Sequence, residues 1–226
     1  MEEIKNEMLL RTDCEGKNAW HIAAFGGEVD IVEEIWELAK ETLTSDEIKN
    51  GMLLRKDGKG RNVWDNAALR GKLDVMQRLW ELAKKILTTE EIKNEMLLST
   101  DGEGRNAWHN AVYEGKLHVI QKIWELANKS LATEEIKNVM LLRTDGKGRN
   151  VWHIAAYSRK LYVIQKILKL AKERLTTEEI KNEMLLSTDG KGRNVWHIAA
   201  YSGNLDVIHK ILQLAKEGLT TEEIKS

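Results

Sequence analysis

The tryptophans of this sequence constrain its fold most strongly, because five of them recur at a constant interval. They stand 44 residues apart, at Trp20, Trp64, Trp108, Trp152 and Trp196. A sequence period between about 20 and 50 residues is the signature of a solenoid, in which each repeat packs against its neighbours. Five such repeats cover nearly all of the 226 residues, so we expect a single repeat array over residues 1–226.

Each repeat opens with a segment that predicts a short amphipathic helix. In the copy at residues 176–186, Thr176 and Glu179 have the spacing of a capping box, in which each side chain accepts a hydrogen bond from the other residue's backbone N–H. Apolar residues then recur four apart, which indicates a helix of about two to three turns. The box recurs in other copies, but Ala132 lacks the hydroxyl group that one of them needs.

A glycine-rich turn and two further helices complete the repeat. In the same copy, Asn194 is a favourable N-cap, and Gly203 stands where that helix should end in a left-handed residue. A longer amphipathic helix then begins near Leu205. In the fourth copy Arg159 replaces the glycine. A non-glycine residue held in the left-handed conformation costs about 1–2 kcal/mol, so either this repeat is locally strained or its turn is rebuilt.

The apolar faces of these helices predict an all-α solenoid, because no repeat can bury its own face without a stacked neighbour. The turns should form hairpin-like fingers between the helical layers. On the longer helix, the first three copies carry Trp36, Trp80 and Trp124, whereas the last two carry Leu168 and Leu212. We therefore expect the first three repeats to pack differently at that layer.

The composition excludes several functional classes. A net charge of −1, from 35 basic and 36 acidic residues, creates no overall field that would attract nucleic acid or a membrane surface. No apolar run approaches the roughly 18 residues of a membrane helix, and no signal-peptide pattern opens the chain. The single cysteine, Cys14, favours a reducing compartment. We expect an intracellular, cytoplasmic protein.

Residues 194–200 read Asn-Val-Trp-His-Ile-Ala-Ala, followed by Gly203 and then Leu-Asp-Val-Ile at 205–208. This motif resembles the ankyrin signature Thr-Pro-Leu-His-x-Ala-Ala, and the resemblance extends over all five copies. The period is 44 residues rather than the usual 33 or so, which implies ankyrin-type repeats that carry one additional short helix each. A HEAT- or armadillo-like solenoid is the alternative, and the signature argues against it.

Four histidines recur in the signature, His21, His109, His153 and His197. Stacked helices lie about 10 Å apart, too far for these residues to share one zinc ion, and the resemblance implies that each histidine bonds the N-cap residue. In the second copy Asp65 takes this place, where its charge should interact favourably with the helix dipole. The Gly-Lys-Gly-Arg turns lack the Walker spacing. We therefore expect no enzyme, no metal and no cofactor.

The resemblance implies that partners contact the finger tips and the adjacent end of the first helix. The ten tip positions hold eight basic residues and two acidic ones, Glu15 and Glu103, and so sum to +6. One large side chain per repeat follows them, and arginine and tyrosine are common in interface hot spots. The predicted partner-binding residues are Lys17, Phe25, Lys59, Arg61, Leu69, Arg105, Tyr113, Lys147, Arg149, Tyr157, Lys191, Arg193 and Tyr201.

These residues predict a protein–protein interaction module that presents a basic, aromatic-studded concave face to an acidic protein partner. Binding of nucleic acid or another polyanion is a second hypothesis, since cations interleaved with aromatic side chains also suit phosphates and stacked bases. A third is a structural or engineered scaffold with a regular surface and no partner. The terminal repeats keep apolar patterns, so self-association through uncapped ends is also expected.

Overall fold

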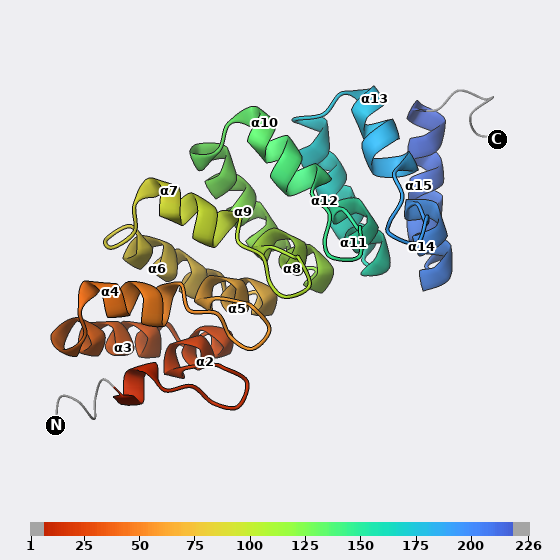
Figure 1. Ribbon diagram of the computed structural model, residues 1–226. Coiled ribbons are helices and arrows are strands. Elements are labelled where there is room, and N and C mark those ends of the chain that lie inside the picture. Colours follow the sequence, from red (N-terminus) through yellow and green to blue (C-terminus); the bar gives the residue numbers. More distant parts are fainter. Residues whose placement is uncertain (1–6, 219–226) are drawn as a thin grey trace. The chain divides into compact units, whose positions relative to one another are not determined.

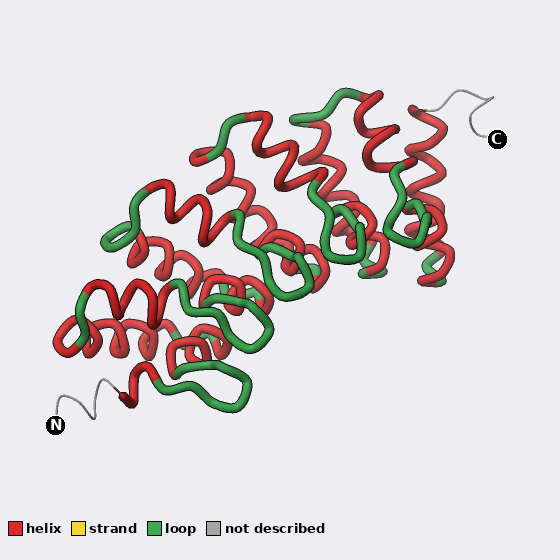
Figure 2. The backbone as a smooth tube through the Cα atoms, viewed as in Figure 1, coloured by secondary structure: helices red, strands yellow, loops and turns green. Residues whose placement is uncertain are grey.

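The computed structural model describes residues 7–218 of the chain, which divides into two compact units. Unit 1 comprises Met1–Ala111 and His118–Leu126, and unit 2 comprises Val112–Leu117 and Ala127–Ser226. Across residues 7–218 all regular structure is helical and no strand occurs (Figures 1 and 2). The same succession of helices returns every 44 residues, as expected of a repeat solenoid.

Each unit is built from a repeated series of a short helix, a longer helix, an α-helical turn and a π-helical segment, which we label η. Unit 1 contains α2 (Ala19–Gly26), α3 (Val29–Thr42), α4 (Ser45–Ile48), η1 (Lys49–Leu53), α5 (Val63–Arg70), α6 (Leu73–Ala83), α7 (Thr89–Ile92) and η2 (Lys93–Leu97). Both units contribute residues to α8 (Ala107–Glu114) and α9 (Leu117–Ser130). Unit 2 continues with α10 (Thr133–Ile136), η3 (Lys137–Leu142), α11 (Val151–Tyr157), α12 (Leu161–Lys172), α13 (Thr177–Glu179), η4 (Ile180–Leu186), α14 (Val195–Ser202) and α15 (Leu205–Gly218).

The additional segment of each repeat starts as the sequence predicts and then departs from it. In α7 the hydroxyl of Thr88 accepts a hydrogen bond from Glu91 N–H at 3.2 Å, and the Glu91 carboxylate accepts one from Thr88 N–H at 2.9 Å. After this single α-helical turn the chain widens into the π-helix η2, which buries Met96 and Leu97.

The predicted difference in packing at the tryptophan layer is present. In unit 1, Trp20 packs on Trp36 with ring centroids 5.8 Å apart, and Trp64 packs on Trp80 at 5.4 Å. In unit 2 the fully buried Trp152 has no such ring partner on α12, where Leu168 takes the equivalent place. Each ring pair adds about 0.5–1.5 kcal/mol beyond its burial, a contribution that the Trp152 layer of unit 2 lacks.

Of the two outcomes that the sequence leaves open at Arg159, a strained backbone or a rebuilt turn, the structure has the strained backbone. Its φ is 60°, and within residues 7–218 it is the sole non-glycine residue with a positive φ. The equivalent positions in the other copies are left-handed glycines, such as Gly71 at 75° and Gly203 at 69°. The fourth repeat thus keeps the common backbone at this turn in spite of the larger side chain.

Over the range that the structure describes, no helix is both long enough and apolar enough to cross a membrane.

Candidate interaction surface

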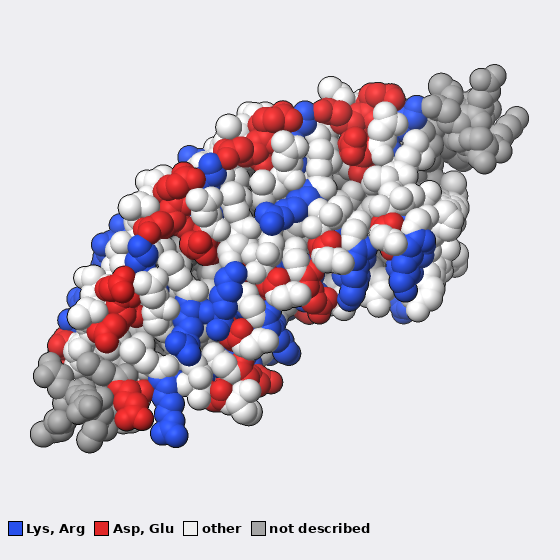
Figure 3. All heavy atoms as spheres, viewed as in Figure 1, with Lys and Arg blue, Asp and Glu red and all other residues white. Residues whose placement is uncertain are grey.

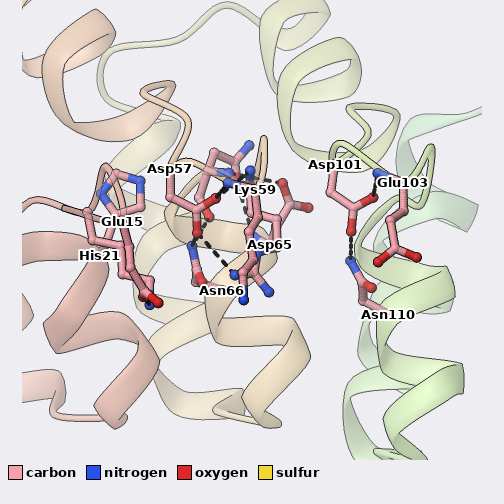
Figure 4. Close-up of polar contacts among 12 residues, drawn as sticks. Glu15, His21, Asp57, Lys59, Asp65, Asn66, Asp101, Glu103 and Asn110 are labelled. Atoms are coloured by element: carbon pink, nitrogen blue, oxygen red, sulfur yellow. Dashed lines mark hydrogen bonds and ion pairs between the residues drawn. The ribbon is translucent and has the colours of Figure 1, made fainter. Parts of the chain in front are cut away.

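Each finger is built around an aspartate, as the finger at residues 57–61 illustrates. The Oδ1 atom of Asp57 accepts hydrogen bonds from the backbone N–H groups of Lys59 at 2.8 Å and Arg61 at 3.0 Å (Figure 4). Its Oδ2 atom accepts a hydrogen bond from Asn66 Nδ2 at 3.1 Å. Burial opposes ionisation of Asp57, but these hydrogen bonds outweigh it and hold the pKa of the carboxyl below its usual value. The ionised aspartate therefore fixes the shape of the turn.

Neighbouring fingers within a unit are joined through their main chains. In unit 1, Gly58 N–H donates to Glu15 O at 2.7 Å, and in unit 2, Gly190 N–H donates to Lys147 O at 2.9 Å. A Cβ atom at Gly58 would lie 2.8 Å from Glu15 O, which is closer than side-chain carbons approach a carbonyl. The glycine is thus required by this close approach of two backbones.

The finger arginines are bound to the aspartates of their own fingers. Arg61 Nη2 lies 3.2 Å from Asp57 Oδ2, and Arg149 donates from Nη2 and Nε to Asp145 Oδ2 at 2.6 and 2.9 Å. The side chains of Arg61 and Arg149 are each 8% exposed, whereas that of Arg193 is 35% exposed. Arg61 and Arg149 thus stabilise the turns and present little surface to a partner.

The charge of the finger surface is smaller than the basic tip residues suggest. The tip positions sum to +6, but the five finger aspartates contribute −5, which leaves +1. In unit 1 the 13%-exposed side chain of Arg105 lies 3.5 Å from Glu103 in addition to its own aspartate. The sequence-based charge count did not include these five aspartates, which are Asp13, Asp57, Asp101, Asp145 and Asp189.

The tip residue Lys17 of unit 1 is engaged by side chains close to it in the sequence. Lys17 Nζ lies 2.5 Å from Glu15 Oε2, and the same ammonium group lies 5.1 Å from the centre of the Phe25 ring. Leu69 is half-buried, and Lys59 is exposed. The opposite charges of Glu15 and Lys17 within the first finger thus compensate each other, and Lys59 is the predicted basic residue of the first two fingers that is exposed.

The tips of unit 2 instead surround an open cleft of about 520 Å³. Lys147 and Lys191 are exposed at its edge, and Arg193 lines it at partial exposure. Two aromatic side chains complete the walls, Tyr157 at 41% and Tyr201 at 72% exposure. The cleft therefore combines basic side chains with aromatic surface.

The tyrosines of unit 2 form a short aromatic series. The rings of Tyr113 and Tyr157 stack with centroids 6.2 Å apart and planes 15° from parallel, and the Arg149 guanidinium lies 5.7 Å from the centre of the Tyr157 ring. A second hollow of about 460 Å³ lies between Tyr157 and Tyr201 and includes the strained Arg159. Both hollows are lined by these two tyrosines, and we treat them together as the candidate site.

Acidic side chains gather elsewhere in each unit. Figure 3 shows red clusters over α4 and α7 in unit 1 and over α10 and α13 in unit 2. They come from the first turns of these helices, where carboxylates interact favourably with the helix dipole. The residues are Asp46, Glu47, Glu90, Glu91, Glu134, Glu135, Glu178 and Glu179.

The signature histidines bond the N-cap residues, as the sequence predicts. His21 Nδ1 lies 2.6 Å from Asn18 Oδ1, and His21 Nε2 lies 2.9 Å from the carbonyl of Arg55 in the following finger. Burial lowers the pKa of His21 below its usual value. With both ring nitrogens engaged, the residue stabilises the seam between repeats. In residues 7–218 no group of histidine, cysteine or acidic side chains is arranged to hold a metal ion.

Asp65 differs from the expectation that its charge favours the helix. The residue is fully buried; its Oδ2 atom accepts a hydrogen bond from Asn62 N–H at 3.1 Å, and its Oδ1 atom has no partner in residues 7–218. Burial raises the pKa of Asp65 to about 8, so the carboxyl is largely protonated at neutral pH. The sequence shows the change from histidine but not the burial that neutralises its replacement.

No protein-family model matches the chain, and no curated protein matches it.

Proposed function

We propose that the chain is a non-catalytic interaction module of the ankyrin type, and that unit 2 binds an acidic segment of a protein partner. The ankyrin assignment is supported by the asparagine N-cap bonded to a histidine, the left-handed residue that ends the first helix, and the glycine-rich fingers. The additional α-to-π segment lengthens each repeat to 44 residues.

The observation that carries the binding proposal is the cleft of about 520 Å³ between two fingers of unit 2. Lys147 and Lys191 contribute positively charged side chains to it. Tyr157 and Tyr201 provide apolar surface with little conformational entropy to lose, which suits the side chains that flank a carboxylate in a peptide. An acidic segment with an aromatic or aliphatic residue beside its carboxylates fits both properties.

Binding of a single-stranded nucleic acid is the second candidate, because the exposed ring of Tyr201 beside Arg193 would also stack a base next to a phosphate. The two candidates differ in their response to salt. Each phosphate contact on a single strand contributes a slope of about −0.7 to log K against log salt, whereas an apolar anchor retains its affinity.

The experiment is a fluorescence-polarisation titration with two labelled probes, an acidic peptide that contains leucine and tyrosine, and a single-stranded oligonucleotide. Each is measured at about 50 and 200 mM salt, the range over which phosphate contacts lose most affinity. The test variant is Lys147→Gln with Lys191→Gln, and the matched control is Lys169→Gln with Lys172→Gln, two exposed lysines on α12 of the same unit.

We expect the peptide to bind the wild type and the control equally, and the cleft variant roughly ten-fold more weakly, since each exposed ion pair contributes about 0.2–1 kcal/mol. Tighter binding of the oligonucleotide with a steep salt slope would replace the proposal with the second candidate. Failure to bind either probe, or equal binding by both variants, would refute the cleft as a partner site and favour a structural scaffold.

A further inference from the structure

In each unit, a glycine that follows the first helix of a repeat is covered by a lysine of the next repeat. In unit 1, a Cβ atom at Gly27 would lie 2.5 Å from Lys72 Cδ. In unit 2, a Cβ atom at Gly115 would lie 2.4 Å from Lys160 Cδ. Lys160 Nζ also donates a hydrogen bond to Glu114 O at 2.6 Å, so its charge is bound to the end of the helix that it covers. The lysine stem thus occupies the space that a side chain at the glycine would need.

The junction between the fourth and fifth repeats carries its long cationic side chain on the opposite residue. Arg159 stands 44 residues after Gly115, and Asn204 stands 44 residues after Lys160. Asparagine lacks the Cδ atom with which lysine covers Gly115, so it leaves room for a side chain at residue 159. Its Nδ2 atom donates a hydrogen bond to Arg159 O at 2.7 Å. The cation of this junction therefore belongs to the earlier repeat.

This exchange leaves the Arg159 guanidinium available to a ligand. The Arg159 side chain is exposed, and it has no hydrogen-bond, ion-pair or ring partner among residues 7–218. Its backbone is left-handed, with a φ of 60°, a conformation that costs free energy for a residue with a Cβ atom. Lysine at the equivalent place in the preceding junction needs no such strain and spends its charge on a carbonyl. Backbone strain of this kind is common at ligand-binding residues.

The exposed guanidinium lines a gap in a series of aromatic rings. Tyr157 stacks on Tyr113 with ring centroids 6.2 Å apart and planes 15° from parallel. Tyr201 is the next member of the series, 44 residues after Tyr157, yet these two described rings make no contact with each other. Between them lies the hollow of about 460 Å³ that Arg159 and Ser202 also line. A flat ring in this hollow would continue the series, because aromatic rings stack with centroids about 4.5–7 Å apart.

We propose that this hollow binds an aromatic ring that bears a phosphate group, and that in the acidic partner segment this group is a phosphorylated tyrosine side chain. The two tyrosine rings favour a flat apolar group, and the guanidinium favours an oxyanion at its edge. Unmodified protein side chains offer one or the other, whereas phosphotyrosine offers both. A phosphate monoester carries a charge of about −1.5 to −2 at pH 7 and three strong acceptor oxygens, and a planar guanidinium can bind two of them.

The inference rests on the proposed function for its partner and deepens it, because it names the group that the partner presents. Both hollows are lined by Tyr157 and Tyr201, so a ring between these tyrosines also borders the cleft of Lys147 and Lys191. The other guanidinium at partial exposure there, that of Arg193, already donates from Nη2 to the carboxylate of its own finger at 2.7 Å. Arg159 has no carboxylate partner among residues 7–218 and is therefore the guanidinium that the phosphate should bind.

The test is a fluorescence-polarisation titration with labelled peptides of one acidic sequence, whose central residue is phosphotyrosine, tyrosine or phosphoserine. We expect the phosphotyrosine peptide to bind about ten-fold more tightly than either of the others, because hydrogen bonds to charged groups are strong and each comparison removes one half of the ligand. The tyrosine peptide lacks the phosphate, and the phosphoserine peptide lacks the ring. Equal affinity of the phosphotyrosine peptide and either comparison peptide would overturn the proposal.

Substitutions at the exchanged junction separate binding from stability. Arg159→Gly restores the glycine of the other repeats, so it should raise the melting temperature and yet weaken binding of the phosphotyrosine peptide about ten-fold. Arg159→Gly with Asn204→Lys rebuilds the junction of Gly115 and Lys160, and it should bind as weakly as the single variant. Lys169→Gln, which removes an exposed lysine on α12, is the control and should bind like the wild type. Wild-type affinity in Arg159→Gly, or recovered affinity in the double variant, would show that the arginine serves the junction and not the ligand.

A probe without a peptide distinguishes this inference from the proposed function. Phenyl phosphate should shift the ring NMR resonances of Tyr157 and Tyr201 in the wild type and not in Arg159→Gly. If these shifts appear but no peptide binds, the hollow is a phosphate site and the proposed function is wrong. If Lys147→Gln with Lys191→Gln weakens binding of the tyrosine peptide while phenyl phosphate shifts neither ring, the proposed function stands and this inference is wrong.

Discussion

Replacing Asp65 with asparagine should stabilise the protein at neutral pH and remove a pH dependence that the wild type has. Asp65 is fully buried in the first turn of α5, and its Oδ1 atom lacks a partner in the part of the chain that the structure describes. Asparagine keeps an oxygen that can accept from Asn62 N–H, as Asp65 Oδ2 does at 3.1 Å. It carries no charge, so it needs no proton to remain buried.

The size of the effect follows from the pKa of Asp65. Burial raises it from 3.8 to about 8; the carboxylate of Asp101 raises it further, while Lys56 and Arg61 oppose the shift. Between about pH 4 and pH 8 the folded protein holds a proton that the unfolded chain releases, so the free energy of unfolding falls by about 1.4 kcal/mol per pH unit as pH rises. At pH 7 the loss relative to pH 4 is roughly 4 kcal/mol.

Urea unfolding followed by tryptophan fluorescence at pH values from about 5 to about 8 measures this difference. The gap between Asp65→Asn and the wild type should widen by about 1.4 kcal/mol per unit across that range. Asp74→Asn, which removes an exposed carboxylate from the first turn of α6, is the control. Its free energy of unfolding should change with pH in the same way as that of the wild type. If the free energy of unfolding of Asp65→Asn also follows that of the wild type across this pH range, Asp65 is ionised in the folded protein and the reasoning from burial is refuted.

Two further substitutions test local backbone energetics. Arg159→Gly should raise the free energy of unfolding by about 1 kcal/mol, because glycine accepts the φ of 60° without a Cβ clash. A lower melting temperature would mean that contacts of the arginine side chain stabilise unit 2 by more than this strain costs. Ala132→Thr should raise the free energy of unfolding by about 1 kcal/mol, because it completes a capping box. The other half of the box is present, since the Glu135 carboxylate accepts a hydrogen bond from Ala132 N–H at 3.1 Å. An unchanged free energy of unfolding in chemical denaturation would show that this helix start does not limit stability.

Much of the fold could be predicted because it depends on local rules that a sequence displays directly. The 44-residue period, the capping box at Thr88 and the left-handed helix end at Gly203 all follow from residue type and spacing. The π-helical segments could not be predicted in the same way. Their apolar spacing also fits an α-helix, and the choice between the two depends on how Met96 and Leu97 meet the core.

The candidate surface was less predictable, because accessibility and charge compensation are properties of the packed chain. Arg61 and Arg193 follow the same tip motif, yet the first side chain is 8% exposed and the second 35%. The finger aspartate is acidic in the sequence like any other, and its role becomes clear only from the hydrogen bonds that converge on Asp57. A sequence-based charge count that paired the arginine of each Asp-Gly-x-Gly-Arg motif with the aspartate of the same motif would have come closer to the small net charge of the finger surface.

The main-chain bonds between fingers have a consequence for how such a surface changes over generations. Glu15 and Lys147 accept the bond from the next finger through their carbonyl oxygens, so neither side chain is needed for the fold. The same tip position already carries glutamate in two repeats and lysine in three. Substitution there can reverse the local sign of charge without disturbing the turn beneath it. A lineage that copies this repeat can therefore alter its binding preference one tip at a time while the architecture stays constant.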